Sequence, residues 1–352
     1  MKSFEHDYYV HQPISQGLLM SVRSLGEFRG RQALYRDQFP EVLETLRRVA
    51  VVQSTESSNR IEGITVPVDR LDAIVAKKSK PKNRSEQEVA GYRDVLADIH
   101  ANASKLKLST TLILQWHKQL FRYTAEEGGI WKQEENVIFE ILDGERKAVR
   151  FRPLPMVATP NAMERLCGLF NERIAEGNAE PLLSIASFVF DFECIHPFKD
   201  GNGRMGRLLT LFLLYRAGYE VGRFISLERV IEESKETYYE ALFNSSQKWH
   251  EGEHDLLPWW SYFLGAITAA YKEFESRIGT ITSARGAKRE MVYAAIHRLP
   301  EEFSFSDIQR VCPGVSFATL KRALQDLKRK KQIVSLGKGR DARWKRIVSL
   351  SH

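Results

Sequence analysis

The chain has 352 residues, 43% of them hydrophobic, so it is long enough to bury a full core with one or two smaller appendages. No run approaches the roughly 20 apolar residues of a membrane span, and no signal peptide opens the chain, so we expect a soluble cytoplasmic protein without a membrane partner. The net charge of +7 is uneven: residues 285–352 carry 16 Lys/Arg and 6 Asp/Glu, which leaves the remainder close to −3.

The three cysteines, Cys167, Cys194 and Cys312, are far apart and form no close pair. Zinc sites and disulfide frameworks both use closely spaced cysteines. We therefore expect all three to be reduced packing residues.

Apolar residues at helical spacing dominate the first third of the chain. They predict a helix over 43–63 that ends at Gly63, and further helices over 88–100 and 110–122. A polar, lysine-rich stretch at 76–88 separates the first helix from the others.

The pattern then changes to β-rich runs on either side of Asp143 and Gly144. Asp-Gly suits a tight turn, so the sequence predicts a hairpin over 136–152. Helices resume over 162–177 and 181–195. The second of these is apolar on nearly all sides, which places it at the centre of the core.

The basic end of the chain predicts a separate small module. Residues 276–286 are small and polar, as in a linker, and helical patterns follow at 288–299, 304–312 and 316–331. Two short strands around a Gly-rich turn, at 332–348, complete the pattern. Three helices and a wing are typical of a winged helix-turn-helix domain.

Residues 196–207 carry the most informative motif: His-Pro-Phe-Lys-Asp-Gly-Asn-Gly-Arg-Met-Gly-Arg, followed at once by the apolar run of another helix. The polar loop therefore lies between two core helices. Gly201 and Gly203 let the backbone approach a ligand, and the free amides and positive dipole end of the next helix favour an anion such as phosphate.

Four side chains of this motif suit chemistry on a polyphosphate. Arg204 and Arg207 are three residues apart on one side of the helix, where both can donate to phosphates. Asp200 is a lone carboxylate beside them, suited to Mg²⁺ that is also bound by the substrate's phosphates. His196 belongs to the residue type that can remove a proton near neutral pH.

The motif resembles the signature of the Fic family, HPFx(D/E)GNGRxxR, at every defined position. The resemblance implies a mainly α fold, with an N-terminal helical region over 1–99, a helical Fic core with a hairpin flap over 100–275, and the winged helix over 276–352. It also implies a nucleotidyltransferase that moves AMP from ATP to a Ser, Thr or Tyr hydroxyl of a target protein, with Mg²⁺ as cofactor and pyrophosphate as the leaving group.

The family's roles carry over onto the motif. His196 is then the general base and Asp200 the metal ligand. The nucleotide-binding residues implied by the resemblance are Phe198, Lys199, Asp200, Gly201, Asn202, Gly203, Arg204 and Arg207. Among them, Asn202 and the loop amides surround the α-phosphate, and the two arginines contact the outer phosphates.

Two other segments resemble parts of Fic proteins. The hairpin over 136–152 stands where the family carries the flap that docks the target peptide by strand addition, although Lys132 replaces the usual Arg before it. Tyr238 and Tyr239 stand where family tyrosines pack near the adenine, and Ser246 replaces a neighbouring Asn. Ordinary helix packing is the alternative role for both tyrosines.

Ser58 and Glu62 are four apart on one face of the helix that ends at Gly63. A glutamate at the negative end of a helix dipole is unfavourable unless a cation offsets it. The stretch resembles the Fic inhibitory motif (S/T)xxxE(G/N), which implies that Glu62 pairs with Arg207 and keeps the γ-phosphate from its productive position. The alternative is an ordinary surface glutamate before a helix-ending glycine.

Three functions remain open at this point. AMP transfer restrained by Glu62 is the leading one, and removal of AMP, with Glu62 helping to position a water, is the related one. The third is a DNA-binding regulator whose core senses nucleotide. A P-loop ATPase or a protein kinase is disfavoured, because neither GxxxxGK[ST] nor an HRD and DFG pair occurs.

The basic module over 285–352 has several partners open to it. DNA phosphates would be contacted by Lys321, Arg322, Arg340 and Arg343, with Ser316 capping the recognition helix. Such modules also dock other proteins or a second copy of the chain, which would make a homodimer. We interpret the remaining histidines, including His117 and His297, as structural.

Overall fold

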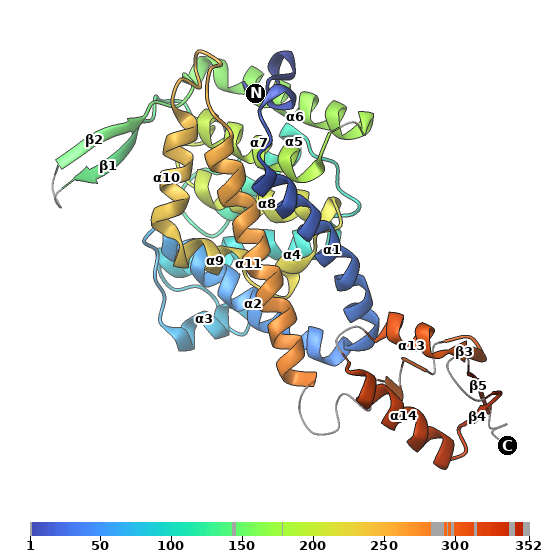
Figure 1. Cartoon of the computed structure of the whole chain (residues 1–352). Coiled ribbons are helices and arrows are strands. Elements are labelled where there is room, and N and C mark those ends of the chain that lie inside the picture. Colours follow the sequence, from blue (N-terminus) through green and yellow to red (C-terminus); the bar gives the residue numbers. More distant parts are fainter. Residues whose placement is uncertain are drawn as a thin grey trace. The chain divides into compact units, whose positions relative to one another are not determined.

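The computed structural model describes residues 2–142, 146–177, 179–282, 292–293, 295–296, 299–312, 315–337 and 342–347. The described chain is mainly helical with small antiparallel sheets, which confirms the predicted fold class (Figure 1). The chain divides into two compact units, residues 1–26 with 46–271 and residues 27–45 with 272–352.

The first unit contains most of the helices and the hairpin. In chain order its elements are η1 (Glu5–His11), α1 (Gln16–Gln38), α2 (Pro40–Ile61), α3 (Val68–Val75), α4 (Arg84–Asn102), α5 (Thr110–Leu120), β1 (Ile138–Leu142), β2 (Arg146–Phe151), η2 (Met156–Ala158), α6 (Thr159–Glu176), α7 (Pro181–Ile195), α8 (Asn202–Arg216), η3 (Val221–Arg223), α9 (Leu227–Glu233), α10 (Lys235–Ser246) and α11 (Leu257–Thr282). Parts of α1, α2 and α11 belong to the second unit.

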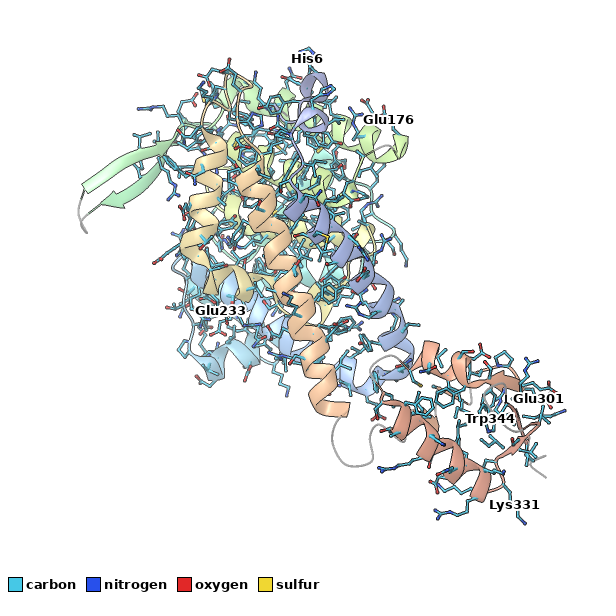
Figure 2. The ribbon with its side chains drawn as sticks, viewed as in Figure 1. His6, Glu176, Glu233, Glu301, Lys331 and Trp344 are labelled. Carbon is cyan, nitrogen blue, oxygen red and sulfur yellow. The ribbon has the colours of Figure 1, made fainter. Side chains whose placement is uncertain are left out.

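Helices α7 and α8 form the centre of the first unit. In each of them 13 of 15 residues are buried, which agrees with the apolar pattern of the sequence. Helix α6 packs on α7, and α4 packs on α8; side chains fill the space between the helices (Figure 2). The segment between α7 and α8, residues 196–201, is therefore anchored at both ends by buried helices.

The cysteines are free and buried, as predicted. Among the described helices, none is both long and apolar enough to cross a membrane.

Strands β1 and β2 pair antiparallel, which confirms the hairpin predicted over 136–152. Phe139 lies opposite Val149, and their exposed fractions are 51% and 47%. The predicted turn at Asp143 and Gly144 lies outside the described residues.

The second unit contains β3 (Glu302–Ser304), α13 (Phe305–Val311), α14 (Phe317–Arg329), β4 (Ile333–Ser335) and β5 (Arg343–Arg346). The strands form one sheet in the order β3-β5-β4. The two wing strands were predicted, but β3 was not, because three residues are too short to show an alternating pattern. It pairs with β5, where the buried Phe303 stacks on Trp344.

The prediction of a linker over 276–286 is wrong for residues 276–282, because α11 continues to Thr282. Ile278 is buried there, which stabilises helix in a stretch whose small polar residues suggested a loop. The rest of the linker, most of the helix predicted over 288–299 with its His297, and Arg340 lie outside the described residues.

One close helix crossing provides a test of this packing. Helix α4 passes α5 at Gly91, where an added Cβ would lie 1.8 Å from the backbone oxygen of Leu120. A helix backbone cannot move aside as a flexible side chain can, so we expect Gly91→Ala to lower the free energy of unfolding by about 1–3 kcal/mol in a urea titration.

Gly168→Ala in α6 is the matched control. Nothing lies within 4 Å of a Cβ added at Gly168, so this change should be neutral or stabilising by up to about 1 kcal/mol, from helix propensity. Equal effects of the two substitutions would contradict the close crossing at Gly91.

Candidate active site

Helix α7 ends at the residue that is central to the site. His196 adopts the left-handed conformation, with φ of 50°, and Pro197 has no N–H with which to continue the helix. The backbone N–H of His196 donates to the Phe192 oxygen at 2.9 Å, which fixes the turn. Non-glycine residues in this conformation concentrate at functional sites, because the strain must be supported by the surroundings.

The imidazole of His196 is neutral and oriented. Its Nδ1 lies 3.3 Å from the Glu193 backbone oxygen, so we assign the proton to Nδ1 and the free lone pair to Nε2. Burial, with the nearby charge of Lys132, lowers the pKa of His196 to about 4. At pH 7 the Nε2 atom can therefore accept a proton, as a general base must.

Asn202 and Phe198 give the loop its shape. Asn202 Oδ1 accepts from the Phe198 N–H at 2.9 Å, and its Nδ2 donates to the Phe198 oxygen at 2.8 Å. The Phe198 ring stacks on His117 with centroids 3.6 Å apart. Both residues were assigned to the nucleotide by resemblance, but in this structure they contact the loop itself.

His117 ties the loop to α5. Its Nδ1 accepts from the Gly129 N–H at 2.8 Å, and its Nε2 lies 3.0 Å from the Asp200 backbone oxygen. Burial lowers the pKa of His117 to about 4, so the ring is neutral and donates from Nε2. No sequence motif marks this role, because it depends on a contact between distant segments.

Lys132 and Asn136 hold the loop from the hairpin side. Lys132 Nζ donates to the Ile195 backbone oxygen at 3.0 Å and to Asn136 Oδ1 at 2.9 Å. Asn136 Nδ2 in turn donates to the backbone oxygens of His196 and Phe198 at 3.2 and 3.1 Å. The sequence drew attention to Lys132 only as a departure from the family, and Asn136 was missed.

The two arginines of the motif have different partners. Arg204 is buried against α4, where it pairs with Glu88 at 2.6 Å, and it lies 3.5 Å from Asp200. Arg207 is also buried and pairs with Glu62 at 2.8 Å. Of the two, Arg207 lines the cavity beside His196.

The end of α2 places Ser58 and Glu62 on Arg207. Arg207 donates from Nε to Ser58 Oγ at 2.9 Å, and from a terminal nitrogen to the Ser58 backbone oxygen and Glu62 Oε1, both at 2.8 Å. Burial raises the pKa of the Glu62 carboxyl, but Arg207 outweighs it and the net pKa is lowered. A Cβ at Gly203 would lie 2.5 Å from Glu62 Oε1, so the carboxylate covers the first turn of α8.

Polar contacts fix this end of α2. The buried Glu228 accepts from Ser54 at 2.7 Å and from Tyr92 at 2.8 Å. Lys235 donates to the Ile61 backbone oxygen at 2.8 Å. Glu62 is therefore held over α8 by several segments that are distant in sequence.

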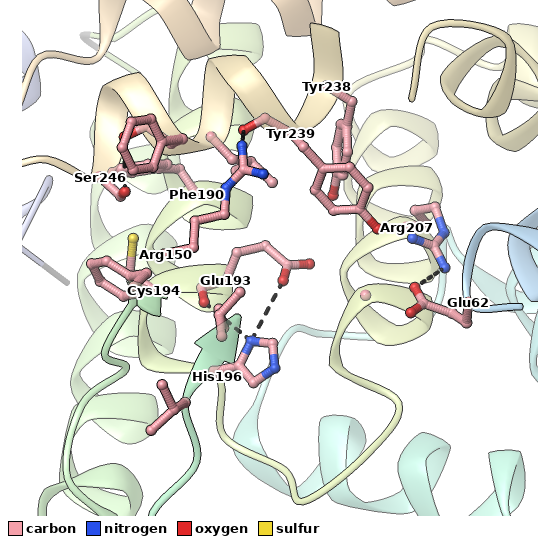
Figure 3. Close-up of a pocket in the computed structure, with 16 residues that line it drawn as sticks. Glu62, Arg150, Phe190, Glu193, Cys194, His196, Arg207, Tyr238, Tyr239 and Ser246 are labelled. Carbon is pink, nitrogen blue, oxygen red and sulfur yellow. Dashed lines mark hydrogen bonds and ion pairs between the residues drawn. The ribbon is translucent and has the colours of Figure 1, made fainter. Parts of the chain in front are cut away.

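A cavity of about 300 Å³ opens beside His196, a volume suited to a small molecule (Figure 3). Of the predicted site residues it gathers Glu62, His196, Gly203, Arg207, Tyr238 and Tyr239, and Ser246 also lines it. The part on α10 and the hairpin is mainly aromatic and aliphatic, with Arg150 as its charged residue. Arg207 of α8, with the carboxyl groups of Glu62 and Glu193 that lie against α8, makes the opposite part polar. Such a cavity suits a flat apolar ring joined to an anionic group.

Lys199 and Asp200 lie in an adjacent groove of about 380 Å³, which Lys132 also lines. Asp200 is more than half exposed, and its Oδ1 accepts from the Gly201 N–H at 2.5 Å. The described residues contain no cluster of three His, Cys, Asp or Glu that could hold an ion. One exposed carboxylate fits only a cation that arrives with its other ligands, as Mg²⁺ does on phosphates.

Sequence reasoning missed two polar residues of the cavity, Arg150 and Glu193. Arg150 of β2 donates to the Tyr239 backbone oxygen, and its guanidinium lies 5.6 Å from the Tyr239 ring and 5.3 Å from the Phe243 ring. It thus joins the hairpin to α10. Glu193 stands three residues before His196, a helical spacing that could have identified it.

The fold and the loop define a helical protein in which the uncapped amides at the start of a buried helix can receive an anion. Residues 107–214 match the Fic/DOC family. The chain therefore contains a domain of that family.

Curated relatives carry names that state an activity. "Protein adenylyltransferase Fic" of Nematostella vectensis is 26% identical over 179 residues, which cover 48% of this chain and 39% of that protein. A "Probable protein adenylyltransferase" of Aquifex aeolicus is 26% identical over 209 residues, which cover 57% of this chain and 59% of that protein. The chain spans less than two thirds of either relative.

Solved structures share the fold. A Fic family protein from Desulfovibrio desulfuricans G20 aligns with a TM-score of 0.62 at 23% identity, over 97% of this chain and 98% of that one. Fic-1 of C. elegans aligns with a TM-score of 0.59 at 19% identity, over 76% and 73%. At these identities the likeness shows the fold alone.

The neutral His117 predicts a pH dependence of stability. The unfolded chain protonates this residue below about pH 6.5, but the folded chain does so only near pH 4, so folding loses stability as the pH falls through that window. In wild type the free energy of unfolding should decline as the pH falls from 6.5 to 5. We expect His117→Gln to make this decline shallower by up to about 1.4 kcal/mol per pH unit, measured by urea unfolding. An unchanged slope would show that His117 is not held neutral.

Proposed function

We propose that this chain is a protein adenylyltransferase that transfers AMP from ATP to a Ser, Thr or Tyr hydroxyl of a target protein. The observation that carries the proposal is a neutral, oriented imidazole, His196, in one cavity with Arg207 at the start of α8. The names of the curated relatives support the same activity.

His196 acts as the base. With Nδ1–H held by the Glu193 carbonyl, Nε2 removes the hydroxyl proton while the oxygen bonds to the α-phosphorus and pyrophosphate leaves. The amides at the start of α8 and Arg207 stabilise the charge on the phosphates. The adenine occupies the apolar part of the cavity, against Tyr239.

Mg²⁺ accompanies the nucleotide in this proposal, held on the protein side by Asp200. When bound, the ion neutralises charge on the phosphates.

The target protein docks on the hairpin. The described residues give this sheet only β1 and β2, so each strand has an unpaired edge that can accept an extended peptide. The exposed Phe139 and Val149 offer apolar contacts beside that edge.

Glu62 restrains the reaction. Its carboxylate lies over Gly203 and on Arg207, which is the position that we assign to an outer phosphate of ATP. Two anions cannot share one cation without repulsion, so Glu62 competes with the productive placement of ATP.

Transfer of label tests the activity, the base and the restraint together. Wild type, Glu62→Gly, and Glu62→Gly with His196→Ala are incubated with α-labelled ATP and Mg²⁺, and label is measured on the protein and in a cell lysate. We expect weak label in wild type, at least about tenfold more in Glu62→Gly, and background in the double variant.

Glu62→Gln separates the effect of charge from the effect of size, because it keeps the size of the side chain but removes its charge. If the charge of Glu62 causes the restraint, label should rise in this variant as well. If Glu62→Gly binds ATP but transfers no label, the proposal of AMP transfer is wrong. Release of AMP from a modified protein would then favour the removal reaction.

The second unit favours a second function, binding of duplex DNA. Helix α14 is capped by Ser316, whose Oγ accepts from the Thr319 N–H, and Lys321 and Arg322 are exposed on it. The corresponding helix of winged helix-turn-helix proteins enters the major groove.

Salt dependence tests this second function. We expect a fluorescent duplex to bind the full chain with an affinity that falls steeply between 50 and 200 mM salt, by roughly tenfold or more. Replacing Lys321 and Arg322 by Ala should weaken binding and reduce the slope of log affinity against log salt by about 2. His196→Ala should bind the duplex as wild type does. An affinity that does not change with salt concentration would contradict DNA binding by the second unit.

A further inference from the structure

A buried carboxyl group of the cavity has no part in the chemistry proposed above. Glu193 lies on the last turn of α7, and its side chain, 11% exposed, lies beside His196 (Figure 3). It packs against α8, where a Cβ at Gly206 would come within 2.1 Å of Glu193 Oε1. A larger residue at position 206 would displace this carboxyl from its place.

Glu193 is incompletely paired. Its Oε1 atom has no hydrogen-bond partner among the described residues. Burying an unpaired carboxyl costs free energy, so such groups in native proteins call for an explanation. Its Oε2 lies 3.9 Å from His196 Nδ1, the ring atom to which we assign the proton. A small shift would join the carboxylate to the base.

Charges on neighbouring elements act on Glu193. Burial raises its pKa to about 7, Arg207 on α8 opposes that rise, and Glu62 at the end of α2 adds to it. Tyr238 on α10 faces the same group. Both forms of the carboxyl therefore exist near neutral pH, and removing Glu62 by substitution favours the ionised one.

The charge that His196 gains in the reaction needs compensation. Burial and Lys132 disfavour the imidazolium, whereas the backbone carbonyl of Glu193 and the carboxylates of Glu62 and Asp200 favour it. Glu62 must leave Arg207 for ATP to take its productive position in our proposal, and Asp200 would then face a metal ion. Glu193 is the carboxylate that remains beside the ring.

We infer that Glu193 is a positioning residue for His196. Its carboxylate faces the Nδ1–H edge, keeps Nε2 toward the cavity, and balances the positive charge that the ring acquires with the hydroxyl proton. The proton stays on Nε2 of His196, and no bond to Glu193 forms. The inference rests on the proposed AMP transfer, because the charge arises in that step.

The kinetic test uses the Glu62→Gly background. Adding Glu193→Gln keeps the side chain's size and removes its charge, so kcat should fall by about 10- to 100-fold with little change in KM for ATP. In the Glu62→Gly background kcat should rise with pH as Glu193 ionises, at a lower pH than with Glu62 in place, and Glu193→Gln should remove that rise. Glu164→Gln, the same charge change on the exposed side of α6, should alter neither quantity.

A second measurement does not need activity. In protein labelled with ¹⁵N-histidine, the His196 Nδ1 resonance is assigned by its loss in His196→Ala. We expect that resonance to shift with a midpoint near pH 7 as Glu193 ionises, and the step to vanish in Glu193→Gln.

The outcomes separate this inference from the proposed function. Loss of the resonance step together with the fall in kcat and the flattened pH profile supports it. Unchanged kinetics in Glu193→Gln, or a lower kcat with an unchanged pH profile, overturns it while transfer stands. If no variant transfers label, the proposed function fails. Independently of that result, a His196 resonance without a step near pH 7 overturns the pairing of Glu193 with His196.

Discussion

Between α7 and α8 the chain leaves one buried helix and enters another across residues 196–201, and the whole site depends on how that short loop is held. Its backbone groups cannot all pair within regular structure, so side chains from other segments take their place. Asn202 closes the loop, His117 binds it to α5, and Asn136 binds it to the hairpin. This support fixes both the imidazole of His196 and the first amides of α8.

The position of the loop at the start of α8 also determines which charges the two arginines of the motif need as partners. Two buried arginines lie near a helix N-terminus, where the dipole and their mutual repulsion disfavour them, so each requires an anion. Arg204 has Glu88, whose side chain is 5% exposed, whereas Arg207 has Glu62, which is 33% exposed at the end of its helix. Glu62 can turn to solvent when it is displaced, whereas Glu88 is buried and is held by both Arg84 and Arg204. Arg207 is thus the place where one anion can exchange for another.

The fold was predictable where the information is local. The apolar residues of 181–195 predict a buried helix, and α7 has those bounds. Two features were not predictable in this way. The last residues of α11 are small and polar but helical, because Ile278 is buried, and β3 is stable only through its pairing with β5. Both depend on packing that a pattern within the segment does not contain.

The sequence by itself determined which chemical groups the motif offers: one imidazole, two guanidiniums, one carboxylate, one ammonium, one amide and a backbone with three glycines. Only the tertiary structure decided how they are used. Arg207 lines the cavity and Arg204 does not, because α2 and α4 bring different carboxylates to the two sides of α8. Arg150 and Glu193 join the site through the packing of the hairpin and of Gly206. The contacts of Arg150 with α10 and of Glu193 with Gly206 join different elements of the fold, and the spacing within one segment does not encode them.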